Sequence, residues 1–229
     1  MIRRFAMILS GGLVILSTTI LAEGGLRCDE QIYDFGHVGI DYQVNHDYKL
    51  NNAGTRPITI DSMKVNCDCS TADLSDSTVP PSGTVTVHLT FNTRDYYGPT
   101  SKSIELFTND AATPRIELFY LSNVGRWIAG LKPEPISLFY LPGHKAKKVT
   151  LTNTQFESYT LEPAGTADEL VSVSLAKTEV KKGQSSVFEV AVPENLGAGT
   201  VNTCFRLRAV VPDIKEPVFL TIPVKIVRY

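Results

Sequence analysis

Two cysteines separated by one residue, Cys67 and Cys69, are the side chains whose type and spacing point most directly to chemistry. Two thiolates at this spacing supply part of a soft-metal site for Cu or Zn, or form a labile, redox-active pair. Each cysteine can instead pair elsewhere in the chain or stay a thiol, and the two further cysteines are Cys28 and Cys204. All four are therefore disulfide candidates.

The predicted strand through this pair argues against a direct bond between Cys67 and Cys69. On a regular strand the two side chains point to the same face, about 6.5 Å apart, whereas the β-carbons of a disulfide lie about 3.8 Å apart. A bond would need a tight turn, in which Asp68 is less accommodating than glycine. Three alternatives follow: pairing elsewhere, with Cys28 nearest because it lies just before the first predicted strand; part of a soft-metal site; or a redox pair.

Two histidines are candidates for a third metal ligand, because two thiolates supply only half of a tetrahedral zinc shell. His46 lies on the inward face of its predicted strand, where a hydrogen-bonded core histidine is the simpler interpretation. His37 lies in the predicted loop after the first strand and is more accessible. Cys204 alternates with Arg206 and Arg208, whose guanidinium groups favour a thiolate; a half-buried sheet cysteine is the simpler interpretation.

Signatures of catalysis are missing from the sequence. It contains no phosphate-binding glycine loop, no HExxH zinc motif and no GxSxG nucleophile elbow. Acidic residues are scattered on predicted turns, so no pair of carboxylates can be argued from spacing. We therefore expect a protein that is not an enzyme and has no cofactor, apart from Cu or Zn if the cysteine pair binds metal.

Short strands separated by turn signals must position these residues. Val44 to Leu50 alternates apolar and polar residues, and Val85, Val87, Leu89 and Phe91 form one face of a clean strand. No stretch beyond the N-terminal segment keeps a helical period. Seven such strands up to residue 124 predict an antiparallel β-sandwich.

The second half of the chain repeats the pattern of the first. Val149 to Asn153 echoes Tyr48 to Asn52, and the part of the second half that corresponds to the cysteine pair, residues 163–173, holds no cysteine. The cysteine pair is therefore an addition to the first unit. The prediction is an all-β chain of two tandem immunoglobulin-like antiparallel β-sandwiches. The predicted segments are a signal peptide at 1–22, a first domain at 28–124, a linker at 125–132 and a second domain at 133–229.

The N-terminal segment resembles an export signal. Arg3 and Arg4 precede an apolar run that ends at Leu21-Ala22-Glu23, which is typical of a cleaved Sec-type signal peptide. The alternative is an uncleaved anchor helix. We expect a periplasmic or secreted protein without a membrane span in its mature chain, whose cysteines meet an oxidising medium.

The charge of the chain bears on its partners. The formal net charge is −2; without residues 1–22, which hold two arginines and no acid, 20 basic and 24 acidic residues remain and the net charge is −4. No block of like charge occurs, so nucleic acid is not an expected partner. The expected partner is a protein of the periplasm or cell envelope.

Five motifs occur in a fixed order over residues 31–124 and point to a family. They are Tyr33-Asp34-Phe35-Gly36-His37-Val38, Leu50-Asn51-Asn52-Ala53-Gly54, Asn66-Cys67-Asp68-Cys69-Ser70, Val79-Pro80-Pro81-Ser82-Gly83 and Phe107-Thr108-Asn109-Asp110. This segment resembles the bacterial family of domains of unknown function 1573, which is marked by a Cys-Gly-Cys-Thr motif and related in shape to ASH and major-sperm-protein immunoglobulin-like domains. The sequence departs from that motif at Asp68 and Ser70. The resemblance implies an exported β-sandwich.

Two functions follow as predictions. The leading one is a non-enzymatic binding or scaffold protein of the bacterial periplasm or cell envelope, which engages its partner by strand addition to a sheet edge. Scaffolding by the eukaryotic shape-relatives supports it by fold-level analogy only. The alternative is a thiol-based metal-binding or redox protein that uses Cys67 and Cys69.

Overall fold

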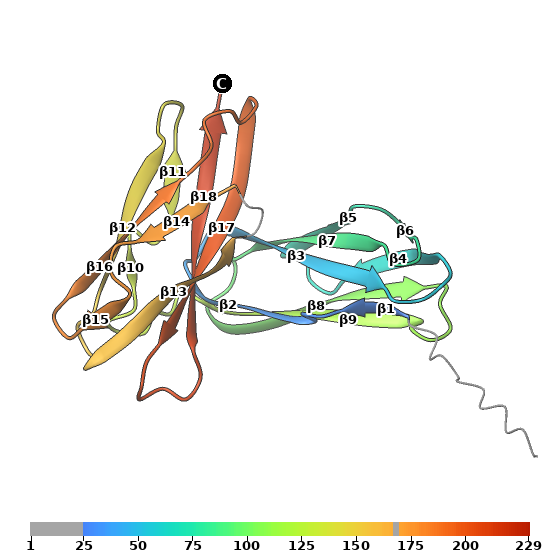
Figure 1. Ribbon diagram of the computed structural model, residues 1–229, viewed down its shortest axis with the longest axis horizontal. Helices are drawn as coiled ribbons and strands as arrows, with labels where there is room; N and C mark the ends of the chain where they lie inside the picture. Colours follow the sequence, from blue (N-terminus) through green and yellow to red (C-terminus); the bar gives the residue numbers. More distant parts are fainter. Residues whose placement is uncertain (1–24, 167–169) are drawn as a thin grey trace, which may run out of the picture.

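The computed structural model describes residues 25–166 and 170–229 as an all-β protein (Figure 1). The signal peptide predicted for residues 1–22 lies outside the described residues. Within the described ranges no helix forms that is long and apolar enough to cross a membrane. The all-β prediction is confirmed.

Eighteen strands make up the described chain, nine in each half. Those of the first half are β1 (Leu26–Cys28), β2 (Ile32–Val38), β3 (Gln43–Asn52), β4 (Ile58–Val65), β5 (Ser70–Leu74), β6 (Thr78–Val79), β7 (Thr84–Asn92), β8 (Gly98–Thr108) and β9 (Arg115–Val124). Those of the second half are β10 (Pro133–Glu134), β11 (Leu138–Tyr140), β12 (Ala146–Thr152), β13 (Ser158–Thr166), β14 (Ser172–Leu175), β15 (Glu179–Lys181), β16 (Ser185–Ala191), β17 (Gly199–Val210) and β18 (Val218–Arg228).

The first sandwich packs the sheet β1-β3-β7-β5 against the strands β2-β9-β8-β4-β6. Its core follows from the period-two pattern: Val85, Val87, Leu89 and Phe91 are each at most 1% exposed, and they alternate along β7 with more exposed residues. Because successive side chains of a strand point to opposite faces, the apolar set of β7 enters the core together. The predicted face of this strand is confirmed.

The second sandwich repeats this arrangement. The sheet β10-β12-β16-β14 packs against β15-β13-β17-β18, and β11 pairs in parallel with β18. A second hydrophobic cluster fills the space between these sheets. In Figure 1 this sandwich stands across one end of the first.

Two predictions about the first strand are wrong. Cys28 does not precede the first strand but lies on it, since β1 pairs Cys28 with Leu50 of β3. His37 is not in a loop, because β2 continues through Gly36 to Val38. A three-residue strand is too short to leave a periodic signal in the sequence. A glycine often ends a strand, but Gly36 lies at a bulge inside β2.

Gly36 allows β2 to reach the second sandwich. It has a φ of +66°, where the register between β2 and β9 shifts, and a β-carbon there would collide with the Phe219 backbone. Only glycine fits both the conformation and the close approach. Beyond it His37 pairs with Leu220 of β18, so the two sandwiches share one continuous sheet. The division into two domains with a linker at 125–132 stays a prediction.

Candidate functional site

The cysteine pair occupies a tight turn between β4 and β5. A disulfide joins Cys67 to Cys69, whose Cα atoms are 5.2 Å apart. The expectation that the pair lies on a regular strand, and that a direct bond between its sulfurs is disfavoured, is wrong. The reason is that β4 ends at Val65 and β5 begins at Ser70, so the backbone reverses at the cysteines.

Local hydrogen bonds hold this turn. The Ser70 N–H donates to the Cys67 carbonyl at 3.4 Å. The Cys69 N–H donates to Cys67 Sγ at 3.0 Å. Asp68 keeps a negative φ and is exposed, so the turn does not require glycine at this position. The expectation that Asp68 makes a tight turn less favourable is therefore wrong.

Both sheets of the first sandwich anchor the turn. Asn66 donates its backbone N–H to the Ser103 carbonyl on β8 at 3.1 Å and its side-chain amide to Ser103 Oγ at 3.1 Å. The Cys69 carbonyl accepts from the Asn92 N–H at the end of β7 at 2.8 Å. The disulfide therefore sits where the chain crosses from one sheet to the other, at a fixed place in the sandwich.

Hydroxyl groups donate to both sulfurs. A disulfide sulfur carries no proton, so the Tyr96 hydroxyl is the donor in its 3.1 Å hydrogen bond with Cys67 Sγ. By the same argument the Ser70 hydroxyl donates to Cys69 Sγ at 3.6 Å. The Tyr120 hydroxyl donates in turn to Ser70 Oγ at 2.8 Å.

The core positions these hydroxyls. Phe91 packs against both tyrosine rings, with centroid distances of 5.7 Å to Tyr96 and 5.5 Å to Tyr120. Lys102 places its ammonium 5.1 Å from the centroid of the Tyr96 ring, a cation–π contact. Burial raises the pKa of Tyr120, against the lowering effect of its hydrogen bond to Ser70, so this phenol stays a proton donor.

The sequence did not identify Tyr96, Ser70, Tyr120 or Lys102 as part of a site. Tyr96 lies in the loop after β7, and Tyr120 and Lys102 lie on β9 and β8. Only the pairing of these strands brings Tyr96, Tyr120 and Lys102 to the turn, and no spacing along the chain predicts it, whereas Ser70 directly follows Cys69. The one feature of the sequence that could have drawn attention to Tyr96 is the pair of adjacent tyrosines at positions 96 and 97.

The disulfide contributes little to the stability of the fold. It joins residues with a sequence separation of only 2. In the chain-entropy account the stabilisation grows with the length of the closed loop, and for so short a loop it comes to about 1–2 kcal/mol. A sandwich with a buried core of this size does not depend on such a bond. A structural role alone therefore explains the pair poorly.

The structure brings neither histidine to the cysteine pair. In the described ranges no three His, Cys, Asp or Glu side chains converge as a metal site requires. His37 is held by a 2.6 Å hydrogen bond between its Nδ1 and the Arg126 carbonyl. His46 is stacked on Tyr33, with centroids 3.5 Å apart.

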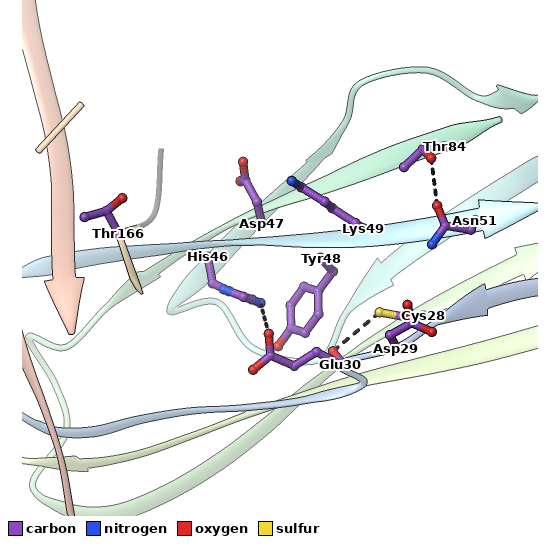
Figure 2. A pocket seen from close by; sticks show the side chains of 10 residues that line it. All are labelled: Cys28, Asp29, Glu30, His46, Asp47, Tyr48, Lys49, Asn51, Thr84 and Thr166. Atoms are coloured by element: carbon purple, nitrogen blue, oxygen red, sulfur yellow. Dashed lines mark hydrogen bonds and ion pairs between the residues drawn. The ribbon is translucent and has the colours of Figure 1, made fainter. Parts of the chain in front are cut away.

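His46 lines a polar groove formed mainly by the first sandwich, to which Thr166 of β13 also contributes (Figure 2). The groove has a volume of about 740 Å³. Its lining includes Cys28, Asp29, Glu30, His46, Asp47, Tyr48, Lys49, Asn51, Thr84 and Thr166. In Figure 2 the imidazole of His46 and the carboxylate of Glu30 point toward one another, with Nε2 and Oε2 3.9 Å apart.

The prediction of a buried His46 is confirmed, but its Nε2 makes no hydrogen bond. Burial, followed by the charge of Arg206, lowers the pKa of His46 to about 3. The carboxylate of Glu30 offsets little of this, since it is half exposed and beyond hydrogen-bond distance. The ring is therefore neutral near pH 7.

The remaining two cysteines are separate from the pair. Cys28 Sγ donates to the Glu30 carbonyl at 3.4 Å in the groove, and burial raises the pKa of this thiol. Cys204 is 3% exposed on β17, and its Sγ donates to the Asn45 carbonyl at 3.4 Å. The proposed pairing with Cys28 is therefore wrong, and Cys204 is more deeply buried than expected.

Comparison with known protein families gives one match, in the first half of the chain. Residues 26–123 match the model of a family described as protein of unknown function (DUF1573). The resemblance drawn from the five motifs is thus confirmed for the first sandwich. No curated protein sequence matches the chain.

Solved structures of slight similarity include a protein of unknown function from Porphyromonas gingivalis W83. It is 13% identical, with 89% of this chain and all of that one covered and a TM-score of 0.35. An ASH/PapD-like domain of human CEP192 is 10% identical over 52% of this chain and 97% of its own, at a TM-score of 0.37. The VesB protease of Vibrio cholerae is 11% identical, at a TM-score of 0.38. The match covers 43% of this chain and only 31% of the protease.

Proposed function

We propose that this chain, whose first sandwich is a domain of the DUF1573 family, is an exported, non-enzymatic binding or scaffold protein of the bacterial periplasm or cell envelope. Its partner is a protein that adds an extended segment to the edge of β5. One observation carries the proposal: β5 ends its sheet, and within the described residues no strand pairs with its outer side.

The register of β5 against β7 determines which peptide groups a partner can reach. The Ser75 N–H, just beyond β5, donates to the Thr86 carbonyl of β7 at 2.9 Å. Hydrogen-bonded pairs alternate along antiparallel strands. The N–H and C=O groups of Ala72 and Leu74 therefore face outward, where an added strand would pair with them.

Among the described strands that end a sheet, β5 is the longest. It has five residues, whereas the other strands that end a sheet in the described chain have two to four. Proteins usually protect long edges with charges, prolines or bulges. β5 has one charged residue, Asp73, and no proline, while Ala72 and Leu74 pack partly against the core and hold the strand in place.

The disulfide supports the proposed export. Disulfides persist in oxidising compartments such as the bacterial periplasm and are rare in the cytosol, where thiols are kept reduced. The Cys67–Cys69 bond and the predicted signal peptide at 1–22 therefore point to the same compartment.

Site-specific photo-crosslinking in the living source cells tests the binding edge. A photo-reactive residue at Asp73, which is exposed on β5, should give a discrete crosslink to one protein of the periplasmic fraction. Ala72→Pro removes an outward N–H while leaving the pairing with β7, so it should abolish that crosslink. Ala72→Ser keeps the N–H and should preserve it.

A second probe position controls for chance contact. Thr160 is also exposed, but β13 is paired on both sides there, with β15 and β17. The same crosslink from Thr160, or an Asp73 crosslink undiminished by Ala72→Pro, would refute strand addition at β5.

A further inference from the structure

The two sulfurs of the disulfide differ in their surroundings. Both cysteines are half-buried, but Cys69 packs against the apolar core of the first sandwich, whereas Cys67 is not part of that packing. Thiol–disulfide exchange requires an attacking thiolate to approach one sulfur in line with the bond that breaks. Cys67 is therefore the sulfur that a partner can reach.

We infer that the Cys67–Cys69 disulfide is a redox centre that accepts two electrons from a protein dithiol through a mixed disulfide on Cys67. This activity goes beyond binding at β5 and does not depend on it. The electron donor is a pair of cysteines in another exported protein, close enough together to form a disulfide, and each disulfide of this chain oxidises one such pair.

Hydrogen bonds prepare Cys67 to carry negative charge. Its Sγ accepts the Cys69 N–H at 3.0 Å and the Tyr96 hydroxyl at 3.1 Å. Donors aimed at a sulfur stabilise the thiolate over the thiol. A disulfide whose reduced form is stabilised in this way is the stronger oxidant. Cys69 has a single, longer contact, 3.6 Å from the Ser70 hydroxyl.

The first step forms the mixed disulfide. A thiolate of the partner attacks Cys67 Sγ, so a bond forms between the partner's sulfur and Cys67 while the bond between Cys67 and Cys69 breaks. The electron pair of the broken bond goes to Cys69 Sγ. That sulfur takes up a proton, because it lies against the apolar core, where the neutral thiol is favoured.

The second step releases the oxidised partner. The partner's other thiolate attacks its own sulfur in the mixed disulfide, so the partner's disulfide forms and its bond to Cys67 breaks. The electron pair goes to Cys67 Sγ, which leaves as a thiolate held by the Cys69 N–H and Tyr96. The partner has lost two electrons and two protons; one proton is on Cys69 and the other passes to solvent.

A redox titration with glutathione tests this inference on the mature chain. The protein is equilibrated with reduced and oxidised glutathione, alkylated, and the modified cysteines are identified by peptide mass. We expect the pair to be reduced readily. Tyr96→Phe, which keeps the ring but removes the hydroxyl, should shift the equilibrium toward the disulfide by about tenfold. Tyr97→Phe, an exposed neighbour, should leave it unchanged.

Single-cysteine variants test which sulfur forms the mixed disulfide. Cys69→Ser should be glutathionylated on Cys67 at least several times faster than Cys67→Ser is on Cys69. A pair that resists millimolar reduced glutathione, equal titrations of Tyr96→Phe and Tyr97→Phe, or faster modification of Cys69 would overturn the inference. Because glutathione replaces the protein partner, each of these results leaves the proposal for β5 standing.

Discussion

His46 is an uncharged histidine packed between aromatic rings. Tyr33 stacks on it at 3.5 Å and Tyr48 meets it edge-on at 4.5 Å. A protonated His46 would be repelled by the positive charge of Arg206, which lies on the Tyr33 ring. The nearby carboxylate of Glu30 is half exposed and offsets little of this repulsion. The first sandwich can therefore accept this side chain only in its neutral form.

A loss of stability in acid follows from this. The unfolded chain protonates His46 below about pH 6.5, whereas the folded chain, in which the pKa is lowered to about 3, does not. The unfolded state then binds more protons, so the free energy of unfolding falls as the pH falls from 6.5 toward 3, by on the order of 4 kcal/mol from this group. Denaturant unfolding measured between pH 4 and 7 should show it.

Matched histidine variants isolate this contribution. His46→Gln should flatten the pH dependence in that interval. His88→Gln, which changes an exposed histidine hydrogen-bonded to Asp47, is measured in parallel, and the difference between the two variants isolates what is specific to position 46. Identical slopes for His46→Gln and the parent chain would contradict the assignment.

At the scale of elements, one asparagine in each half plays the same part. The side-chain amide of Asn52 donates to the carbonyls of Arg56 and Val79, at 2.8 and 2.9 Å. That of Asn153 donates to Phe156 and Val180, both at 2.9 Å. Asn52 is the last residue of β3, Asn153 directly follows the last residue of β12, and each is at most 1% exposed. The repeat read from Tyr48 to Asn52 and from Val149 to Asn153 thus reflects a shared turn.

Removal of one such amide should be costly. Asn52→Ala leaves two carbonyls without their donor, one of them buried, and we expect a loss of about 2–3 kcal/mol in the free energy of unfolding. Asn51→Ala removes only an exposed hydrogen bond with Thr84 and should cost less than about 1 kcal/mol. Urea unfolding of the two variants measures the difference, and equal losses would refute the role of Asn52.

At the scale of the whole molecule, Arg206 joins the two sandwiches. It projects from β17, and its guanidinium carbon lies 4.1 Å from the ring centroid of Tyr33 and 4.4 Å from that of Phe219. It also donates to the Asp34 carbonyl. A planar cation that stacks between two rings and donates a hydrogen bond to a carbonyl fits arginine and not lysine.

Arg206→Lys should loosen this junction. We expect a loss of about 1–3 kcal/mol in stability and a broader distribution of particle dimensions in small-angle X-ray scattering. Arg208→Lys is the control on the same strand, because Arg208 makes an exposed ion pair with Glu162 at 3.0 Å and should change neither quantity. Scattering curves that coincide for both variants would show that Arg206 does not hold the sandwiches together.

The sequence alone determined what depends on local pattern. Alternation along Val85 to Phe91 specified the core face of β7, because a strand's side chains point to opposite faces in turn. The echo of Asn52 in Asn153 specified the repeated sandwich, because both turns need the same amide. Five motifs in order also predicted the family model that residues 26–123 match.

Only the tertiary structure decided which cysteines are bonded and which side chains surround them. The bond between Cys67 and Cys69 depends on where β4 ends and β5 begins, and a strand end set by pairing leaves little trace in local sequence. Tyr96 and Tyr120 reach the sulfurs because strands distant in the chain pack around Phe91. Arg206 meets Tyr33 across 173 residues for the same reason. Such contacts arise from the packing of sheets, which periodicity along one strand does not encode.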